Sequence, residues 1–148
     1  MLSYVPGMRQ LESLDAWRTG QDLAEAAYRL TMERPIDQHF KLVDQIRRAA
    51  ISIPANIAEG YALSTTSQFV RCLRISLGSA AELRAHLELA QRLKLADTHR
   101  VAEGITLCLR VISILVGLLR KLERRSGSRF PFPISRFPAK TADPAKPS

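Results

Sequence analysis

Apolar residues recur at helical spacing over four long segments of the chain, and no segment alternates with the period of two that a strand requires. The spacing predicts helices over residues 15–33, 37–62, 66–95 and 98–125. The connections between these segments are short, which favours antiparallel neighbours. The pattern therefore predicts an all-α protein, an antiparallel up-down-up-down four-helix bundle.

The second predicted helix contains Pro54. A proline inside a helix lacks the N–H donor, and its ring clashes with the carbonyl four residues back. Because the apolar spacing continues past Pro54 to Ile57 and Tyr61, we predict that this helix is kinked at Pro54 and continues beyond it. The expected core positions of the helix are Phe40, Val43, Ile46, Ala50, Ile53 and Ile57.

The fourth predicted helix is apolar on more than one face. One stripe continues the seam of the bundle, and a second stripe consists of Leu107, Val111, Ile114 and Leu118. A helix that is apolar all round is buried all round, whereas a four-helix bundle covers one face of each helix. We therefore predict that the protein forms a homo-oligomer through the second stripe. The alternatives are a helix crossing within the chain and tolerated exposure of apolar side chains.

Three observations indicate a cytoplasmic protein that does not enter a membrane. The most apolar segment, residues 105–119, includes Arg110, and it is shorter than the roughly 20 apolar residues of a spanning helix. The N-terminal residues show no basic region followed by an apolar run. Cys72 and Cys108 lie in predicted helices without the spacing of a metal site, so we expect both to be reduced thiols in the core.

The composition changes at residue 126. Residues 126–148 hold five of the eight prolines and show no helical period, so we expect a disordered basic tail. The tail repeats one tripeptide, as Arg129-Phe130-Pro131 and Arg136-Phe137-Pro138, which could stack on bases or dock in an aromatic groove. The alternative is a solvated tail without a partner. The predicted organisation is an N-terminal extension (1–13), a bundle domain (14–125) and this tail.

The charge of the chain favours an anionic partner. Lys and Arg total 22 against 14 Asp and Glu, which gives a net charge of +8. Such an excess attracts nucleic acid through its backbone, and no motif for reading bases is present. We predict binding to RNA or DNA with low sequence specificity; the alternative is a set of ordinary solvated helix faces. The candidate contacts are Arg47, Arg48, Arg71, Arg74, Arg92, Arg120, Lys121, Arg124 and Arg125.

The sequence favours a protein that is not an enzyme and holds no metal or cofactor. A di-iron bundle needs Glu-x-x-His pairs on facing helices, whereas Glu82 and His86 are spaced by four. No phosphate-binding glycine loop is present. Asn56 and Glu59 could form a small polar site, but the expected alternative is structural: Glu59 pairs with an arginine inside the bundle, such as Arg47 or Arg71.

The run from Gln45 to Gly60, QIRRAAISIPANIAEG, is distinctive. With Trp17, Phe69 and the stretch Gly78-Ser79-x-x-Glu82-Leu83, it resembles the signature of the bacterial "four helix bundle protein" family over roughly residues 11–125. This family includes proteins encoded in intervening sequences of large-subunit ribosomal RNA genes. It is related to the accessory variability determinant of diversity-generating retroelements. The motif residues with an expected structural role are Ser52, Pro54, Asn56, Glu59, Gly60, Gly78 and Glu82.

The resemblance implies an antiparallel four-helix bundle that assembles as a homopentamer, a barrel of five bundles. For the retroelement branch it implies a basic barrel that binds a reverse transcriptase and nucleic acid. For the intervening-sequence branch, to which the match is closer, it implies no established biochemical activity. The resulting hypothesis is a non-enzymatic, oligomeric bundle that binds nucleic acid, as an accessory to an enzyme such as a reverse transcriptase. The alternative is a protein–protein interaction scaffold with no nucleic-acid binding.

Overall fold

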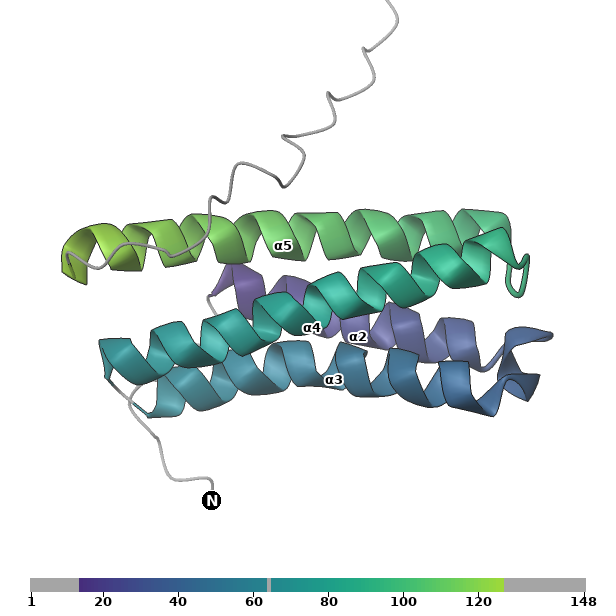
Figure 1. Ribbon diagram of the computed structural model, residues 1–148, viewed down its shortest axis with the longest axis horizontal. Coiled ribbons are helices and arrows are strands. Elements are labelled where there is room, and N and C mark those ends of the chain that lie inside the picture. Colours follow the sequence, from purple (N-terminus) through teal and green to yellow (C-terminus); the bar gives the residue numbers. More distant parts are fainter. Residues whose placement is uncertain (1–13, 64, 127–148) are drawn as a thin grey trace, which may run out of the picture.

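The computed structural model describes residues 14–63 and 65–126, of which residues 125 and 126 are described by their backbone alone. Within these ranges the chain forms helices and no strand. The elements are α2 (Asp15–Thr31), the 3₁₀ turn η1 (Ile36–Gln38), α3 (Phe40–Ala62), α4 (Thr66–Arg92) and α5 (Thr98–Ser126). The long helices lie side by side (Figure 1), so the predicted all-α four-helix architecture is confirmed.

The starts of α4 and α5 lie where polar side chains can satisfy free backbone N–H groups. The hydroxyl of Thr65 accepts a hydrogen bond from the N–H of Gln68, at 3.2 Å. The carboxylate of Asp97 accepts one from the N–H of Arg100, at 3.0 Å. Each cap replaces the missing partner of a first-turn donor, and therefore fixes where its helix begins.

The core runs along the whole bundle, because α2 packs against α3 and α5, and α4 packs against the same two helices. Aliphatic side chains with no exposed surface come from every helix. Burying such a side chain stabilises the fold by about 1.5–3 kcal/mol relative to exposure. The largest of these side chains on the four helices are Leu23, Ile46, Ile53, Ile57, Leu73, Leu83, Leu87, Leu115 and Leu119.

One predicted core position in α3 is wrong. Phe40 is 79% exposed, whereas Ile36, four residues earlier, is completely buried. The reason is the break at His39 between η1 and α3, which shifts the helical register. Phe40 is consequently the first residue of α3 and points away from the core that the later residues of the stripe share.

Pro54 lies inside α3 without ending it. The helix continues from Phe40 to Ala62, as predicted, while the kink itself stays a prediction. Pro54 is buried beside Gly20 of α2: a Cβ at Gly20 would meet the Ile53 side chain at 3.2 Å and the Pro54 Cα at 3.7 Å. The small residue at position 20 therefore lets α2 approach α3 closely at the proline.

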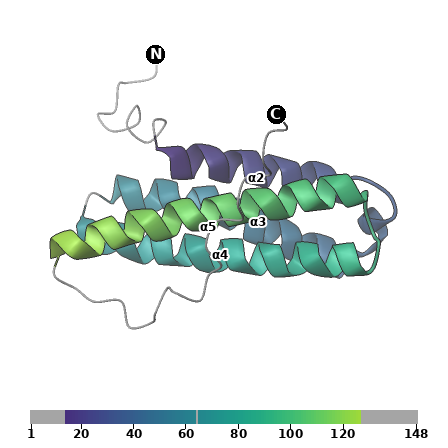
Figure 2. The same ribbon diagram turned by 90° about the horizontal axis from the view of Figure 1, so that it is seen from above.

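Helix α5 is long and apolar enough, over Thr98–Arg124, to cross a membrane by length and composition alone. In the bundle, however, it supplies completely buried residues to the core along its length: Val101, Cys108, Val111, Leu115 and Leu119. Core helices of soluble bundles have this same composition. Figure 2 shows α5 packed across the other helices.

Candidate nucleic-acid interface

Five of the predicted basic residues gather at one end of the bundle. The start of α4 and the end of α5 meet there, because these helices are antiparallel neighbours (Figure 1). An ion pair of 3.1 Å between Arg74 Nη2 and Glu123 Oε1 joins them. Arg125 follows in the last turn of α5, but its side chain lies outside the described residues. We call the exposed set the basic end; its members are Arg71, Arg74, Arg120, Lys121 and Arg124.

The acidic residue between these cations is neutralised. Glu123 is 8% exposed, and Arg74 covers its carboxylate. The positive charges of the other four members therefore dominate the surface that α4 and α5 present at this end. Guanidinium groups present several N–H donors in a planar fork that fits phosphate oxygens. Chemically, this arrangement is suited to binding phosphate groups and offers nothing that would read a base sequence.

Arg110 extends the basic end along α5, although the sequence analysis did not include it. Its side chain is exposed. It precedes Lys121 by 11 residues and Arg124 by 14, which are close to three and four helical turns, so the three residues share one face. This spacing was the available signal, but the apolar residues around Arg110 concealed it.

The structure separates the remaining predicted basic residues from this end. The Arg47 Nε donates a hydrogen bond to the Thr31 hydroxyl at 2.9 Å, and its guanidinium lies 4.8 Å from the centre of the Tyr28 ring. Arg47 therefore ties α3 to α2. Arg48 is exposed on α3, and Arg92 is exposed in the last turn of α4, at the opposite end of the bundle.

The polar motif residues of α3 join this helix to α4. The Asn56 amide donates to the Ser52 carbonyl at 2.8 Å and to the Ser52 hydroxyl at 3.0 Å. The Ser79 hydroxyl donates to the Ser52 hydroxyl at 2.8 Å, and the buried Ser76 hydroxyl donates to the Ile53 carbonyl at 2.9 Å. These groups are hydroxyls, amides and carbonyls, with no titratable base among them. Their geometry fixes the α3–α4 register.

The predicted internal ion pair of Glu59 is wrong. Glu59 is exposed on α3, and Arg47, its expected partner, bonds to Thr31 instead. A charged carboxylate is more stable in water than in the interior unless it is paired. Glu82 is also at the surface, where its carboxylate lies 3.2 Å from His86 Nε2, one turn away. Residues 14–63 and 65–126 hold no cluster of three or more metal-ligand side chains.

The two motif glycines of α3 and α4 have different surroundings. Gly60 is buried, and a Cβ there would lie 2.6 Å from the Cys72 Cβ. Gly78 is exposed, and a Cβ there would meet nothing within 4 Å. Gly60 is therefore required by close packing, whereas the described chain imposes no such requirement at Gly78.

The second apolar stripe of α5 divides into two parts. Val111 has no exposed surface and belongs to the core, so its assignment to a subunit interface is wrong. The cause is that α5 packs against both α2 and α4, which gives it a wider buried face than one seam. Leu107, Ile114 and Leu118 pack against the core but remain partly exposed. These three define the apolar strip of α5.

Both cysteines are buried and free of disulfides, in agreement with the prediction of core thiols. Burial away from water raises the pKa of the Cys108 thiol to about 12. Arg84 opposes this shift, and Glu88 adds to it. These two side chains pair with each other at 2.8 Å. A thiol with so high a pKa stays protonated and unreactive at neutral pH.

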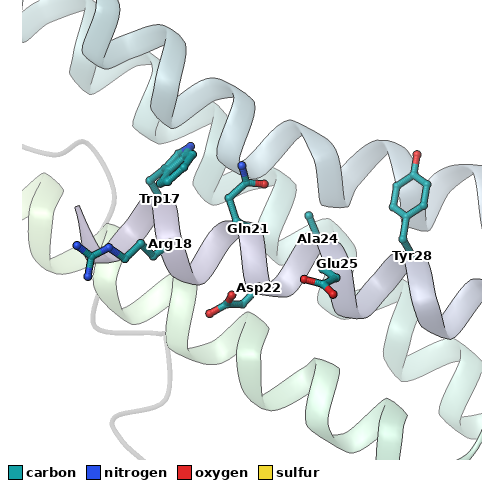
Figure 3. A pocket seen from close by; sticks show the side chains of 7 residues that line it. All are labelled: Trp17, Arg18, Gln21, Asp22, Ala24, Glu25 and Tyr28. Atoms are coloured by element: carbon teal, nitrogen blue, oxygen red, sulfur yellow. The ribbon is translucent and has the colours of Figure 1, made fainter. Parts of the chain in front are cut away.

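An open groove of about 670 Å³ lies along the outer surface of α2. Trp17, Gln21 and Tyr28 point from it toward α3, whereas Arg18, Asp22 and Glu25 point to the other side (Figure 3). The groove thus combines aromatic rings with carboxylates. The sequence alone does not reveal this groove, because its residues match no functional motif.

Comparisons with known proteins bear on the family and the fold of this chain, and not on its chemistry. Residues 12–117 match the family model described as 23S rRNA-intervening sequence protein. The chain belongs to this family. A solved structure from Bacteroides thetaiotaomicron, a protein of unknown function from the S23 ribosomal protein family, shares 21% sequence identity and has a TM-score of 0.65. The similarity covers 71% of this chain and 98% of that one, and it supports the fold. No functionally curated protein matches.

Proposed function

We propose that this member of the intervening-sequence protein family is a non-enzymatic cytoplasmic protein that binds the phosphate backbone of RNA or DNA. The observation that carries the proposal is the basic end, where four cations without an ion pair among the described residues lie on two adjacent helices. Backbone contacts release counterions and give binding that is steep in salt and tolerant of sequence. The motif resemblance supports the narrower form of this proposal, an accessory role to a nucleic-acid enzyme such as a reverse transcriptase.

The triple variant Arg120→Gln/Lys121→Gln/Arg124→Gln is expected to weaken binding to duplex DNA and to flatten its salt dependence. Each lost phosphate contact lowers the slope of log K against log salt by about 0.9, so three contacts lower it by about 2.7. Fluorescence anisotropy of a mixed-sequence duplex at several salt concentrations measures the slope. A matched RNA duplex measured in parallel identifies the preferred nucleic acid.

The matched control is Lys41→Gln/Arg48→Gln/Arg92→Gln, which removes the same charge from exposed positions away from the basic end. We expect the slope of log K against log salt for this variant to differ from that of the unmodified protein by less than the value for one phosphate contact, about 0.9. Equal losses in both triple variants would show that net charge alone drives binding. Absence of binding at low salt would refute the proposal itself. Arg74 is kept in both variants, since its removal would leave Glu123 nearly buried without this partner.

We also propose that the protein assembles into a homo-oligomer, and specifically the pentamer that the motif resemblance implies. The apolar strip of α5 supports self-association, because its side chains are partly exposed along several turns of the helix. The same helix also contributes buried side chains to the core. Apolar surface of this kind is the usual centre of subunit interfaces. Five copies would also multiply the positive charge of the basic end on one particle.

The variant Leu107→Gln/Leu118→Gln is expected to shift the protein to monomers, because it places amides where the proposed interface excludes water. Light scattering after size-exclusion chromatography measures the mass. Thr106→Gln/Ser113→Gln, at exposed positions of the same helix, is the control and should keep the mass of the unmodified protein. Circular dichroism confirms that both variants fold. An unmodified protein that is already monomeric would disprove the assembly.

A second candidate function, a scaffold for another protein, is favoured by one observation. Phe40 is 79% exposed and Met32 is 65% exposed, near the connection between α2 and α3. Large exposed apolar side chains are common anchors of protein interfaces. Under this function the salt-dependent binding described above is absent, so the same anisotropy measurement separates the two candidates.

A further inference from the structure

The groove on α2 has the chemistry of a site for a cationic, proline-containing peptide. Trp17 and Tyr28 line its side toward α3, and Asp22 and Glu25 line the opposite side together with one cation, Arg18. Aromatic grooves bind proline-rich segments through flat ring faces, and aromatic rings attract guanidinium groups. Glu25 already pairs with Arg29 at 2.8 Å. Asp22 is exposed and has no ion pair within the described residues, so it is available to an incoming cation.

Charge favours the protein's own C-terminal segment as the occupant. Among the four helices, α2 alone carries more acidic than basic residues, three against two. Residues 127–148, which lie outside the described structure, carry four basic residues and one acidic residue. They also contain arginine next to phenylalanine and proline, twice. This segment therefore carries the groups that the groove is suited to bind.

The position of α5 determines which part of the segment can reach the groove. An ion pair between Arg100 and Glu33 places the start of α5 beside the end of α2. Helix α5 has 29 residues and α2 has 17. At 1.5 Å per residue, α5 therefore extends about 12–18 Å beyond the start of α2. Figures 1 and 2 show this overhang. A segment that follows α5 can reach the groove only by returning along α2.

The lengths set the first residue of the segment that can reach each contact. Trp17 lies about 18–23 Å and Asp22 about 25–30 Å from the end of α5, with helix axes about 10 Å apart. An extended chain spans at most about 3.3–3.6 Å per residue. Pro133, seven residues after Ser126, reaches Trp17, and Arg136, ten residues after it, reaches Asp22. Arg129 is only three residues beyond the helix and spans about 10 Å, so the first repeat falls short.

We propose that the C-terminal segment of each chain docks on its own α2 groove, with Pro133 against Trp17 and Arg136 paired with Asp22. The segment runs in the same direction as α2. The two Arg-Phe-Pro repeats thus have different roles despite their identical sequence: the second repeat binds the groove, and the first bridges the overhang of α5. Docking places the positive charge of the segment over the acidic helix.

Trp17 is the single tryptophan of the chain, so its fluorescence reports on the groove directly. We expect Arg136→Glu in the full chain to make Trp17 more accessible to quenching by acrylamide. The ratio of docked to undocked protein should fall about five-fold, the effect of one exposed charge contact. Arg129→Glu is the matched control, with the same change of charge in the same tripeptide, and should leave the quenching constant unchanged. Circular dichroism verifies the fold of each variant.

A charge exchange completes the test. Asp22→Arg combined with Arg136→Glu restores an opposite-charge pair and should return the quenching constant toward that of the unmodified protein. Equal quenching in the unmodified protein and Arg136→Glu would overturn the proposal, as would equal effects of Arg129→Glu and Arg136→Glu. Protection of Trp17 that disappears on dilution would assign the groove to the segment of a second copy, which also overturns docking within one chain.

Discussion

Replacing Gly60 by alanine is expected to destabilise the protein by about 2 kcal/mol, although alanine is the better helix former by about 1 kcal/mol. The added methyl group would lie 2.6 Å from the Cys72 Cβ and 3.1 Å from the Phe69 ring. Real Cβ atoms do not approach so closely, and the Cys72 Cβ is fixed to the backbone of α4. The two helices must therefore separate locally, which opens the α3–α4 seam.

Gly78→Ala is the matched control within the same family motif. Gly78 lies inside α4, and its Cβ would meet nothing within 4 Å. Only the helix-propensity gain remains, so this variant should be stabilised by up to about 1 kcal/mol. Urea unfolding at low protein concentration measures both changes as shifts of the midpoint at constant slope. Stabilisation of Gly60→Ala would show that α3 and α4 adjust to the methyl group at little cost.

The glycines illustrate which features of the fold the sequence can predict and which it cannot. A run of apolar residues at helical spacing identifies each helix to within a few residues, because burial of one face is what stabilises it. The motif includes both Gly60 and Gly78 among its structural residues. Only the distance between α3 and α4 shows that one is packed against Cys72 and the other is open. That distance depends on the register of two helices, which local spacing does not encode.

Phe40 and Val111 show that local spacing also does not fix which apolar residues are buried in the core. Phe40 fits the apolar stripe of α3 but is its first residue, after the break at His39, and it points outward. Val111 lies outside the seam expected for α5, yet the contacts of α5 with two neighbours bury it. Periodicity predicts which residues share a face. The number of neighbours that cover this face is a property of the assembled bundle.

The candidate site was predictable in composition but not in arrangement. Antiparallel topology brings the start of α4 to the end of α5, so Arg71 and Arg124 belong to one surface. Nothing in the sequence shows that Arg47, one of the same predicted set, is held by Thr31 and Tyr28. The side chain of an arginine is long enough to reach either solvent or a neighbouring helix. Its role is decided by the partners within reach.

The pH dependence of stability is expected to depend on Cys108, which has no exposed surface. Burial raises the pKa of its thiol from 9.0 to about 12, with Arg84 opposing and Glu88 adding to the shift. Above pH 9 the unfolded chain releases this proton while the folded protein retains it. The stabilisation is therefore complete below about pH 9 and is lost as the pH rises toward 12. Three pH units correspond to about 4 kcal/mol.

Urea unfolding of the unmodified protein and of Cys108→Ala, at pH 8 and pH 11, isolates this contribution. All other ionisable groups are common to both proteins, so their effects cancel in the difference. The alanine variant loses packing at every pH, which lowers its free energy of unfolding by the same amount at pH 8 and pH 11. Relative to the alanine variant, the unmodified protein should lose about 3 kcal/mol of its free energy of unfolding from pH 8 to pH 11. A difference between the two proteins that stays constant would mean that the thiolate is accommodated in the core, by hydration or by closer approach of Arg84.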